Sequence, residues 1–333
     1  MSSLPTVSQD SKADAADTTL LGGVFPGQGA QSIGMLNALA QAYPIVRETF
    51  AELSDSLSFD LWSLVTDGPA SELNRTENTQ PVMLAAGVAV WRAWRAAGGR
   101  APVIMAGHSF GEYTALVCGG ALDFREAAIL VRERGRLMQA AVKERDGAMA
   151  AVLGLDDAEV ADICAQAAED LIVAPVNFNA PGQVVIAGDS AAVSRAMSLA
   201  TALGARRVLR LAVSVPAHCS LMMPAAQALA PRLAKAQLRS PDIPVLHNVD
   251  VRHHDDADTI RVMLARQLYS PVRWVETIRS FATRGVSGVL EFGPGKVLSG
   301  LNKRIDKSLQ CACIYDPQSL EQALVLSRAA RAC

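Results

Sequence analysis

Three times along this 333-residue chain, an apolar stretch runs into a glycine-rich turn that a helical pattern follows. The expected pairs of strand and helix are 20–25 with 34–40, 103–107 with 112–118, and 288–292 with 297–304. Repeated strand–turn–helix units are typical of a parallel sheet covered by helices. Functional groups in such sheets gather at the carboxyl ends of the strands, which is where the three turns lie.

The middle of the chain follows another pattern, with short expected strands separated by two expected helices. The strands are 148–153, 174–178, 184–187 and 207–213, and the helices are 157–168 and 191–203. The order β-α-β-β-α-β is that of a ferredoxin-like unit. We therefore predict a small ferredoxin-like domain over 142–212, inserted into a large α/β domain over 19–141 and 213–333, after a flexible tail over 1–18.

Composition narrows the class of protein. Half of the residues are apolar and 19% are charged, as in a globular chain, and 31 Lys and Arg against 33 Asp and Glu argue against a nucleic-acid binder. The longest apolar run, 81–91, is too short to span a membrane, and residues 1–18 lack the apolar stretch of a signal peptide. Six cysteines form no CxxC pair, so we expect reduced thiols and a cytoplasmic protein without a metal site.

The turn at 107–111 reads Gly-His-Ser-Phe-Gly and fits G-x-S-x-G. The glycines permit a sharp strand-to-helix turn that exposes the hydroxyl of Ser109, as in α/β-hydrolase-like sheets. The next N–H, on Phe110, can then point at a developing oxyanion. An apolar strand before the turn and a helix after it favour a nucleophile over a chance turn serine.

A nucleophilic serine needs a base, and the chain has five histidines. His108 adjoins the serine across a sharp turn and should diverge from it. His253 and His254 lie in an Asp-rich loop, where solvation is expected, and His247 lies in an expected strand, 243–249, where a structural role is expected. His218 follows a Pro-containing turn, and the residues alone leave it open between base and structural histidine.

The acid of a hydrolase triad is missing from its usual place. Asp250 is the nearest obvious candidate, but it follows His218, whereas the hydrolase acid precedes the histidine.

Two other features of the sequence could take part in such a site. The Gly-rich stretch 27–31 could offer the N–H of Gln28 as a second oxyanion donor, or be a simple tight turn. Arg134 could bind a substrate carboxylate, or be a solvated helix charge.

Taken together, these residues resemble the malonyl-CoA:acyl carrier protein transacylase family. The matching motifs lie in order at 25–31, 107–113, 177–188, 214–219, 266–269 and 293–298, so that the resemblance covers about residues 20–315. It implies a ping-pong transfer of malonyl from coenzyme A to the phosphopantetheine thiol of acyl carrier protein. In this reaction Ser109 would form the malonyl ester and His218 would move the proton, without an acidic third member.

The resemblance also assigns roles around this pair. Arg134 would clamp the malonyl carboxylate, and the N–H groups of Gln28 and Phe110 would form the oxyanion hole. The main-chain carbonyl of Gln267 would orient the imidazole. Leu, Val or Ile is common at position 110 in this family. The bulkier Phe110 would either narrow the acyl pocket and favour malonyl over methylmalonyl, or mark a relative that serves polyketide synthases in trans.

The acceptor implied by the resemblance is a small acidic protein, so a local basic patch is expected. The candidates are Arg206, Arg207, Lys303 and Arg304, each of which could also be an ordinary surface charge. No metal or redox cofactor is implied, since the coenzyme A thioester is a substrate, and a monomer fits the family.

Three other functions stay open at this point. A discrete acyltransferase that loads polyketide synthase carrier domains would have the same motifs. A serine esterase would share the nucleophile, but Arg134 and the Gln28 motif argue against it. A non-catalytic interaction subunit would have lost Ser109 or His218, and both are present.

Overall fold

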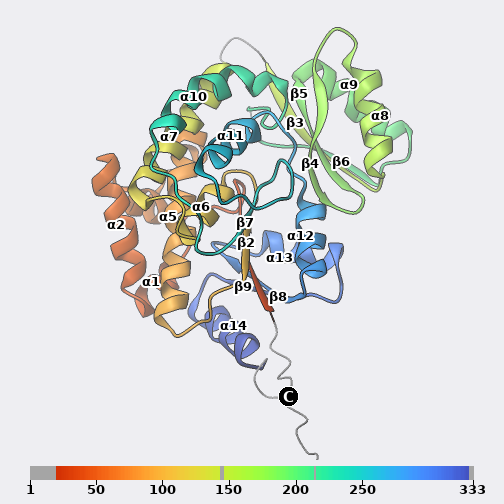
Figure 1. Ribbon diagram of the computed structural model, residues 1–333. Coiled ribbons are helices and arrows are strands. Elements are labelled where there is room, and N and C mark those ends of the chain that lie inside the picture. Colours follow the sequence, from red (N-terminus) through yellow and green to blue (C-terminus); the bar gives the residue numbers. More distant parts are fainter. Residues whose placement is uncertain (1–19, 143–145, 214, 330–333) are drawn as a thin grey trace, which may run out of the picture.

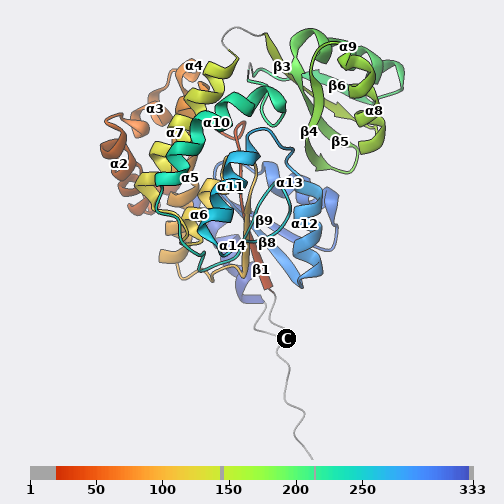
Figure 2. The same cartoon turned by 45° about the horizontal axis from the view of Figure 1, so that its top comes forward.

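The computed structural model describes residues 20–142, 146–213 and 215–329, and it contains two separate β-sheets (Figures 1 and 2). The expected tail over 1–18 lies outside the described residues. The larger sheet has the strand order β7-β2-β1-β8-β9, and all its paired strands run parallel. Its strands are β1 (Leu20–Phe25), β2 (Ile104–Gly107), β7 (Val245–Leu246), β8 (Val286–Phe292) and β9 (Gln310–Ile314).

Helices cover both faces of this sheet. Alternate residues of a strand point to opposite faces, and Phe25 belongs to one hydrophobic cluster while its neighbour Val24 belongs to another. In the described residues the helices outside the smaller sheet are α1 (Asn37–Ala42), α2 (Ile45–Leu57), α3 (Leu61–Asp67), α4 (Ala70–Leu73), α5 (Thr76–Ala96), α6 (Gly111–Cys118), α7 (Phe124–Ala141), α10 (Met223–Lys235), α11 (Ala257–Gln267), α12 (Trp274–Thr283), α13 (Val297–Ile305) and α14 (Pro317–Ala329), with a 3₁₀ turn at Ser220–Met222.

The apolar run 81–91 is the centre of α5, which is buried along most of its length. It packs with α2, α6 and α7 on the Phe25 face of the sheet, whereas α12 and α13 cover the Val24 face. Within the described residues, no helix is both long and apolar enough to cross a membrane.

Two predicted elements of the large domain differ from the structure. The strand predicted over 243–249 pairs at Val245 and Leu246 alone, because the chain turns out of the sheet where the N–H of Val251 bonds the carbonyl of His247. The helix predicted from residue 34 begins at Asn37, because Leu36 has a left-handed backbone, with φ 63°. Both differences lie at element ends, and the sheet order is unaffected.

The smaller sheet is antiparallel, with the strand order β4-β5-β3-β6. Its helices and strands are β3 (Gly147–Leu153), α8 (Asp157–Ala168), β4 (Val173–Ala180), β5 (Gln183–Asp189), α9 (Ser190–Ala202) and β6 (Arg207–Arg210). The order along the chain is therefore β-α-β-β-α-β, around a hydrophobic cluster of its own. The connection between β4 and β5 is tight, because β4 extends to Ala180 and Gly182 takes a positive φ. The strand predicted over 207–213 ends early, at Arg210.

One edge of the smaller sheet is joined to the larger part of the molecule. Asn177 on β4 forms a parallel bridge with Val272, the N–H of Phe178 bonds the carbonyl of Val272 (3.0 Å), and the N–H of Val272 bonds the carbonyl of Val176 (2.8 Å). The four strands of this sheet fall within 142–212 and those of the other sheet outside it. The domain boundaries themselves stay a prediction, and residues 143–145 and 214 lie outside the described residues.

Candidate active site

Ser109 lies on the sharp turn between β2 and α6, at the carboxyl end of a central strand. Its backbone is left-handed, with φ 54°, which costs roughly 1–3 kcal/mol for a residue with a side chain. The flanking glycines are required by space. A Cβ at Gly107 would lie 1.9 Å from the carbonyl carbon of Gly111, and one at Gly111 would lie 2.5 Å from the oxygen of Phe25. The turn therefore presents the Ser109 hydroxyl above the end of the sheet.

The structure brings His218 to this hydroxyl, across 109 residues of sequence. Nε2 of His218 is 2.7 Å from Oγ of Ser109, while Nδ1 is 2.8 Å from the main-chain oxygen of Gln267 and 3.2 Å from that of Ser270. Because both oxygens can only accept, Nδ1 carries the proton and Nε2 accepts from the Ser109 hydroxyl. Burial, with the nearby positive charge of Arg134 as the next cause, lowers the pKa of His218 to about 3. The imidazole is therefore neutral at neutral pH.

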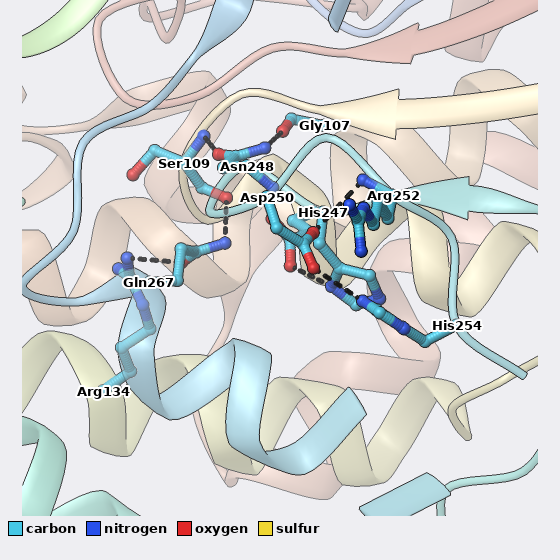
Figure 3. A network of polar contacts seen from close by, with 10 residues as sticks. Gly107, Ser109, Arg134, His247, Asn248, Asp250, Arg252, His254 and Gln267 are labelled. Carbon is cyan, nitrogen blue, oxygen red and sulfur yellow. Dashed lines mark hydrogen bonds and ion pairs between the residues drawn. The ribbon is translucent and has the colours of Figure 1, made fainter. Parts of the chain in front are cut away.

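The candidate triad acid does not reach this imidazole. Asp250 instead pairs with Nε2 of His254 (2.8 Å), in the loop that Figure 3 shows beside His247. Within the described residues, the hydrogen bonds of the His218 ring go to the Ser109 hydroxyl and to two main-chain oxygens, with no carboxylate among them. His253 is exposed. The arrangement at Ser109 is a pair of serine and histidine.

The two remaining histidines have partners of their own. His108 places Nε2 2.8 Å from Oδ1 of Asn179, and its ring lies 5.4 Å from that of Trp274. Burial lowers the pKa of His108. His247 is fully buried, with Nδ1 2.7 Å from a carboxylate oxygen of Glu112. Neither ring is directed at the Ser109 hydroxyl, in agreement with the interpretation of the sequence.

Arg134 lies inside the molecule, where 1% of the residue is exposed. Its Nη1 donates to Oε1 of Gln80 (3.0 Å) and its Nη2 to Oε1 of Gln267 (3.0 Å), while the guanidinium faces the ring of Tyr113 at 5.9 Å. Burial lowers the pKa of Arg134, yet a guanidinium keeps its proton in proteins. Among the described residues no carboxylate forms an ion pair with it, and its hydrogen bonds go to neutral groups, namely the two amide oxygens and Sδ of Met138 (3.2 Å).

Ser109, His218 and Arg134 open onto one cavity of about 120 Å³. Gln28 and Phe110 line the same cavity, whose walls come from the turns after β1 and β2, from α5 and α7, and from the smaller sheet. The other lining residues are Thr76, Gln80, Met138, Met149, Asn177, Leu211, Val213, Val215 and Ala217. The walls are mostly apolar, so an anion entering the cavity would find its positive partner in Arg134.

The N–H groups of the turn leave one donor for a ligand. The N–H of Ser109 is taken by Oδ1 of Asn248, and those of His108 and of residues 111–113 bond main-chain oxygens. In the run 108–113, the N–H of Phe110 is the one without an acceptor in the described part of the chain. Phe110 is the N-cap of α6, and the positive end of this helix strengthens the attraction of its N–H for an anion.

The four basic residues predicted for a protein partner are exposed. Arg206 directly precedes β6 and Arg207 begins it, and Lys303 and Arg304 lie in the last turn of α13. The Arg304 guanidinium also donates to the carbonyl of Pro181 (3.3 Å). No contact in the structure tests their predicted role.

Two buried amides of this site were missed by the sequence analysis. Asn248 bridges the turn, because its Oδ1 accepts from the N–H of Ser109 (2.8 Å) and its Nδ2 donates to the carbonyl of Gly107 (2.7 Å) (Figure 3). Nothing in its sequence surroundings marks it. Gln80 did leave a signal, since it is a polar residue directly before the apolar run 81–91.

Within the described residues, no group of three or more His, Cys, Asp and Glu side chains could hold a metal ion. The cysteines in this part of the chain are unpaired thiols. The contact between Ser109 and His218 offers nucleophilic attack by a serine hydroxyl.

Comparison with known proteins gives a consistent result. The chain matches the family described as "Acyl transferase domain" over residues 24–310. It is 54% identical over 303 residues to the malonyl CoA-acyl carrier protein transacylase of Escherichia coli K12, covering 91% of this chain and 98% of that relative. It is 41% identical over 302 residues to the Bacillus subtilis protein of the same name, covering 90% and 95%.

Solved structures agree with the sequence relatives. The malonyl CoA-acyl carrier protein transacylase of Coxiella burnetii superposes with a TM-score of 0.92 at 47% identity, covering 93% of this chain and 98% of that one. A malonyl-transacylase solved in complex with its type II PKS acyl-carrier protein gives a TM-score of 0.91 at 53% identity, covering 92% and 100%. The α/β fold with its parallel sheet is thus shared across the chain.

Proposed function

This chain belongs to the acyl transferase domain family, and we propose that it transfers malonyl from malonyl-CoA to the phosphopantetheine thiol of an acyl carrier protein. The names of relatives at 54% and 41% identity support this activity, and so does the chemistry of the site. The reaction is an S-malonyltransfer that proceeds in two halves through an ester on Ser109.

The observation that carries the proposal is the charge of Arg134. A guanidinium in a buried site with two neutral amide acceptors is costly unless a ligand brings a negative charge. The malonyl carboxylate supplies that charge through a charge-assisted, bidentate pair. Arg134 therefore selects an acyl group that ends in a carboxylate and fixes it beside Ser109.

In the first half-reaction, Nε2 of His218 removes the Ser109 proton as Oγ attacks the thioester carbonyl. The resulting oxyanion accepts hydrogen bonds from the N–H groups of Phe110 and Gln28. The carbon–sulfur bond then breaks, and His218 gives its proton to the leaving coenzyme A thiolate. The product is a malonyl ester on Ser109.

In the second half-reaction, His218 takes the proton of the incoming pantetheine thiol, whose sulfur attacks the ester carbonyl. The carbon–oxygen bond breaks, and Ser109 recovers its proton from His218. The main-chain oxygen of Gln267 holds Nδ1–H throughout, so the ring keeps its tautomer. A thiolate is a better leaving group than an amine, so a pair without an acid suffices.

The other functions weighed from the sequence are less well supported. An esterase would have no use for a buried Arg134 that has no ion-pair partner among the described residues. The relatives named above are malonyl transacylases, which favours this activity over a dedicated polyketide loader, although one of them was solved with a type II PKS carrier.

The test is intact-mass spectrometry after brief mixing with malonyl-CoA, followed by addition of acyl carrier protein. We expect a malonyl adduct on the protein that is absent in Ser109→Ala and moves to the carrier. An adduct lost to water at the same rate with or without the carrier would instead establish a hydrolase. Absence of any adduct would refute the transfer. Running methylmalonyl-CoA and a polyketide carrier alongside addresses the remaining alternative.

A further inference from the structure

Asn248 is a buried residue outside the Ser109–His218 pair that contacts both sides of the nucleophile turn. It is 1% exposed and lies in the loop after β7, far in sequence from the turn. Its Oδ1 accepts the N–H of Ser109 at 2.8 Å, and its Nδ2 donates to the carbonyl of Gly107 at 2.7 Å (Figure 3). One side-chain amide thus spans the residue before the turn and the nucleophile itself.

The two hydrogen bonds of the Asn248 amide take the place of main-chain pairing between β2 and β7. β2 and β7 pair in parallel at Met105 with Val245 and at Ala106 with Leu246, and there the pairing ends. At Gly107 the strand bends into the turn, where main-chain groups of β7 can no longer follow it. The amide of Asn248 offers one donor and one acceptor, as a peptide group does, and continues the pairing into the turn.

Asn248 is itself held at both main-chain groups. Its N–H donates to one oxygen of the Glu112 carboxylate (2.9 Å), and the other oxygen of that carboxylate lies 2.7 Å from Nδ1 of His247. Its carbonyl accepts the N–H of Arg273 (3.4 Å). Glu112 is fully buried in the first turn of α6, so Asn248 is anchored to the helix that the nucleophile turn begins.

The turn needs such an anchor because Ser109 is held in a conformation that serine does not favour. Its φ of 54° suits glycine, but the reaction needs the hydroxyl. Without a partner for its N–H, the Ser109 peptide could relax toward an ordinary φ, and Oγ would move away from Nε2 of His218. The carbonyl of Ser109 is held separately, by Nε2 of Gln267 (3.0 Å).

We infer that Asn248 is a positioning residue for the nucleophile: its amide fixes the Ser109 peptide so that Oγ meets His218 and the Phe110 N–H stays aimed at the oxyanion. This inference rests on the proposed function. Because Asn248 occupies the N–H of Ser109, the N–H of Phe110 is the donor that the turn leaves for the oxyanion. The oxyanion can therefore accept a hydrogen bond from this turn in one orientation. An aspartate of the same shape could accept from Ser109 but, when ionised, could not donate to Gly107.

The experiment measures formation of the malonyl ester in a single turnover with malonyl-CoA, without carrier protein. For Asn248→Ala we expect the first-order acylation constant to fall about 10- to 100-fold, because small displacements of reacting groups cost that much. The malonyl-CoA concentration at half-saturation should change less than threefold, since Arg134 is untouched. Asn248→Asp, which keeps one of the two bonds, should lose less than Asn248→Ala.

The matched control is Asn302→Ala. Asn302 is a fully buried asparagine whose amide oxygen accepts from Nε1 of Trp274 (3.0 Å), far in sequence from Ser109. It should lower the thermal midpoint as Asn248→Ala does, yet leave the acylation constant at the wild-type value. If both variants reduce acylation equally, Asn248 contributes general stability and the inference is wrong.

A second readout separates this inference from the proposed function. A fluorophosphonate labels a reactive serine whatever acyl group the enzyme uses, and its rate should fall in Asn248→Ala by a factor similar to that for acylation. Wild-type labelling without a malonyl adduct would refute malonyl transfer and leave the positioning role standing. Labelling and acylation within threefold of wild type in folded Asn248→Ala would overturn the positioning role.

Discussion

The side chain of Gln267 accepts a hydrogen bond from Nη2 of Arg134 at 3.0 Å. The same residue places its main-chain oxygen 2.8 Å from Nδ1 of His218 and donates from Nε2 to the carbonyl of Ser109. The positive group, the base and the nucleophile therefore meet one residue through three different atoms. Because Gln267 is neutral, it orients Arg134 without cancelling its charge.

Replacing Arg134 by alanine should reverse the preference between acyl groups. We expect kcat/KM for malonyl-CoA to fall by a factor equivalent to a loss of ~2–4 kcal/mol in transition-state stabilisation, because a charge-assisted pair is left unmade. The kcat/KM for acetyl-CoA should stay close to wild type or improve. Steady-state kinetics with both thioesters checks this. Equal effects on both would mean that Arg134 does not bind the carboxylate.

Replacing Gln80 by glutamate should give Arg134 an internal carboxylate and so compete with the substrate. Nη1 of Arg134 already bonds Oε1 of Gln80 at 3.0 Å, so the new charge would lie in contact. We expect kcat/KM for malonyl-CoA to fall on the order of 100-fold, equivalent to a lost pair of about 3 kcal/mol. Gln80→Leu, which removes the hydrogen bond without adding charge, is the control and should lose clearly less.

His218 should make the protein sensitive to acid. Its pKa is lowered by burial to about 3 in the folded protein, against 6.5 as the ordinary value, so the unfolded chain takes up the proton first. The neutral His218 therefore contributes to the free energy of unfolding above pH 6.5, and this contribution is lost as the pH falls toward 3. The loss amounts to about 2 kcal/mol at pH 5.

The check is the free energy of unfolding of wild type and His218→Asn between pH 7.5 and pH 5. The gap between the two proteins should shift by about 2 kcal/mol in favour of the variant as the pH falls. The exposed His253→Asn serves as control and should run parallel to wild type. A gap that does not change with pH would show that His218 titrates normally in the folded protein.

Charge reversal at Lys303 and Arg304 tests the predicted docking patch for the carrier. Both residues are exposed on α13. We expect the KM for acyl carrier protein to rise about tenfold or more in the double variant Lys303→Glu/Arg304→Glu, since rim charges steer an acidic partner. Acylation by malonyl-CoA alone should not change. An unaltered KM for the carrier would remove this pair from the interface.

Much of the fold could be predicted because its glycines mark the turns. The expected strands over 20–25, 103–107 and 288–292 lie within a residue or two of β1, β2 and β8. The predicted strand 243–249 was too long because the chain turns out of the sheet directly after Leu246. Periodicity reports which residues can be buried, and it does not report where a neighbouring strand turns away.

The candidate site could be predicted in part for a similar reason. Ser109 lies in a motif that carries its own local geometry, whereas Asn248 acts through contacts 139 residues away along the chain. The residues alone left Arg134 open between a solvated charge and a buried one, because a helix position does not show which side faces the core. Its burial settles that placement, and its role remains the proposal made above.

The bridge between Asn177 and Val272 has a consequence for which acyl groups fit. The cavity beside Ser109 has one wall from the larger sheet's turns and helices and another that includes Met149 and Asn177 of the smaller sheet. Its width therefore depends on how the two sheets are placed relative to each other, and this bridge is one of the contacts that join them. Val272 does not line the cavity, yet a substitution there should change the range of acyl groups accepted, because it would shift the wall that carries Asn177.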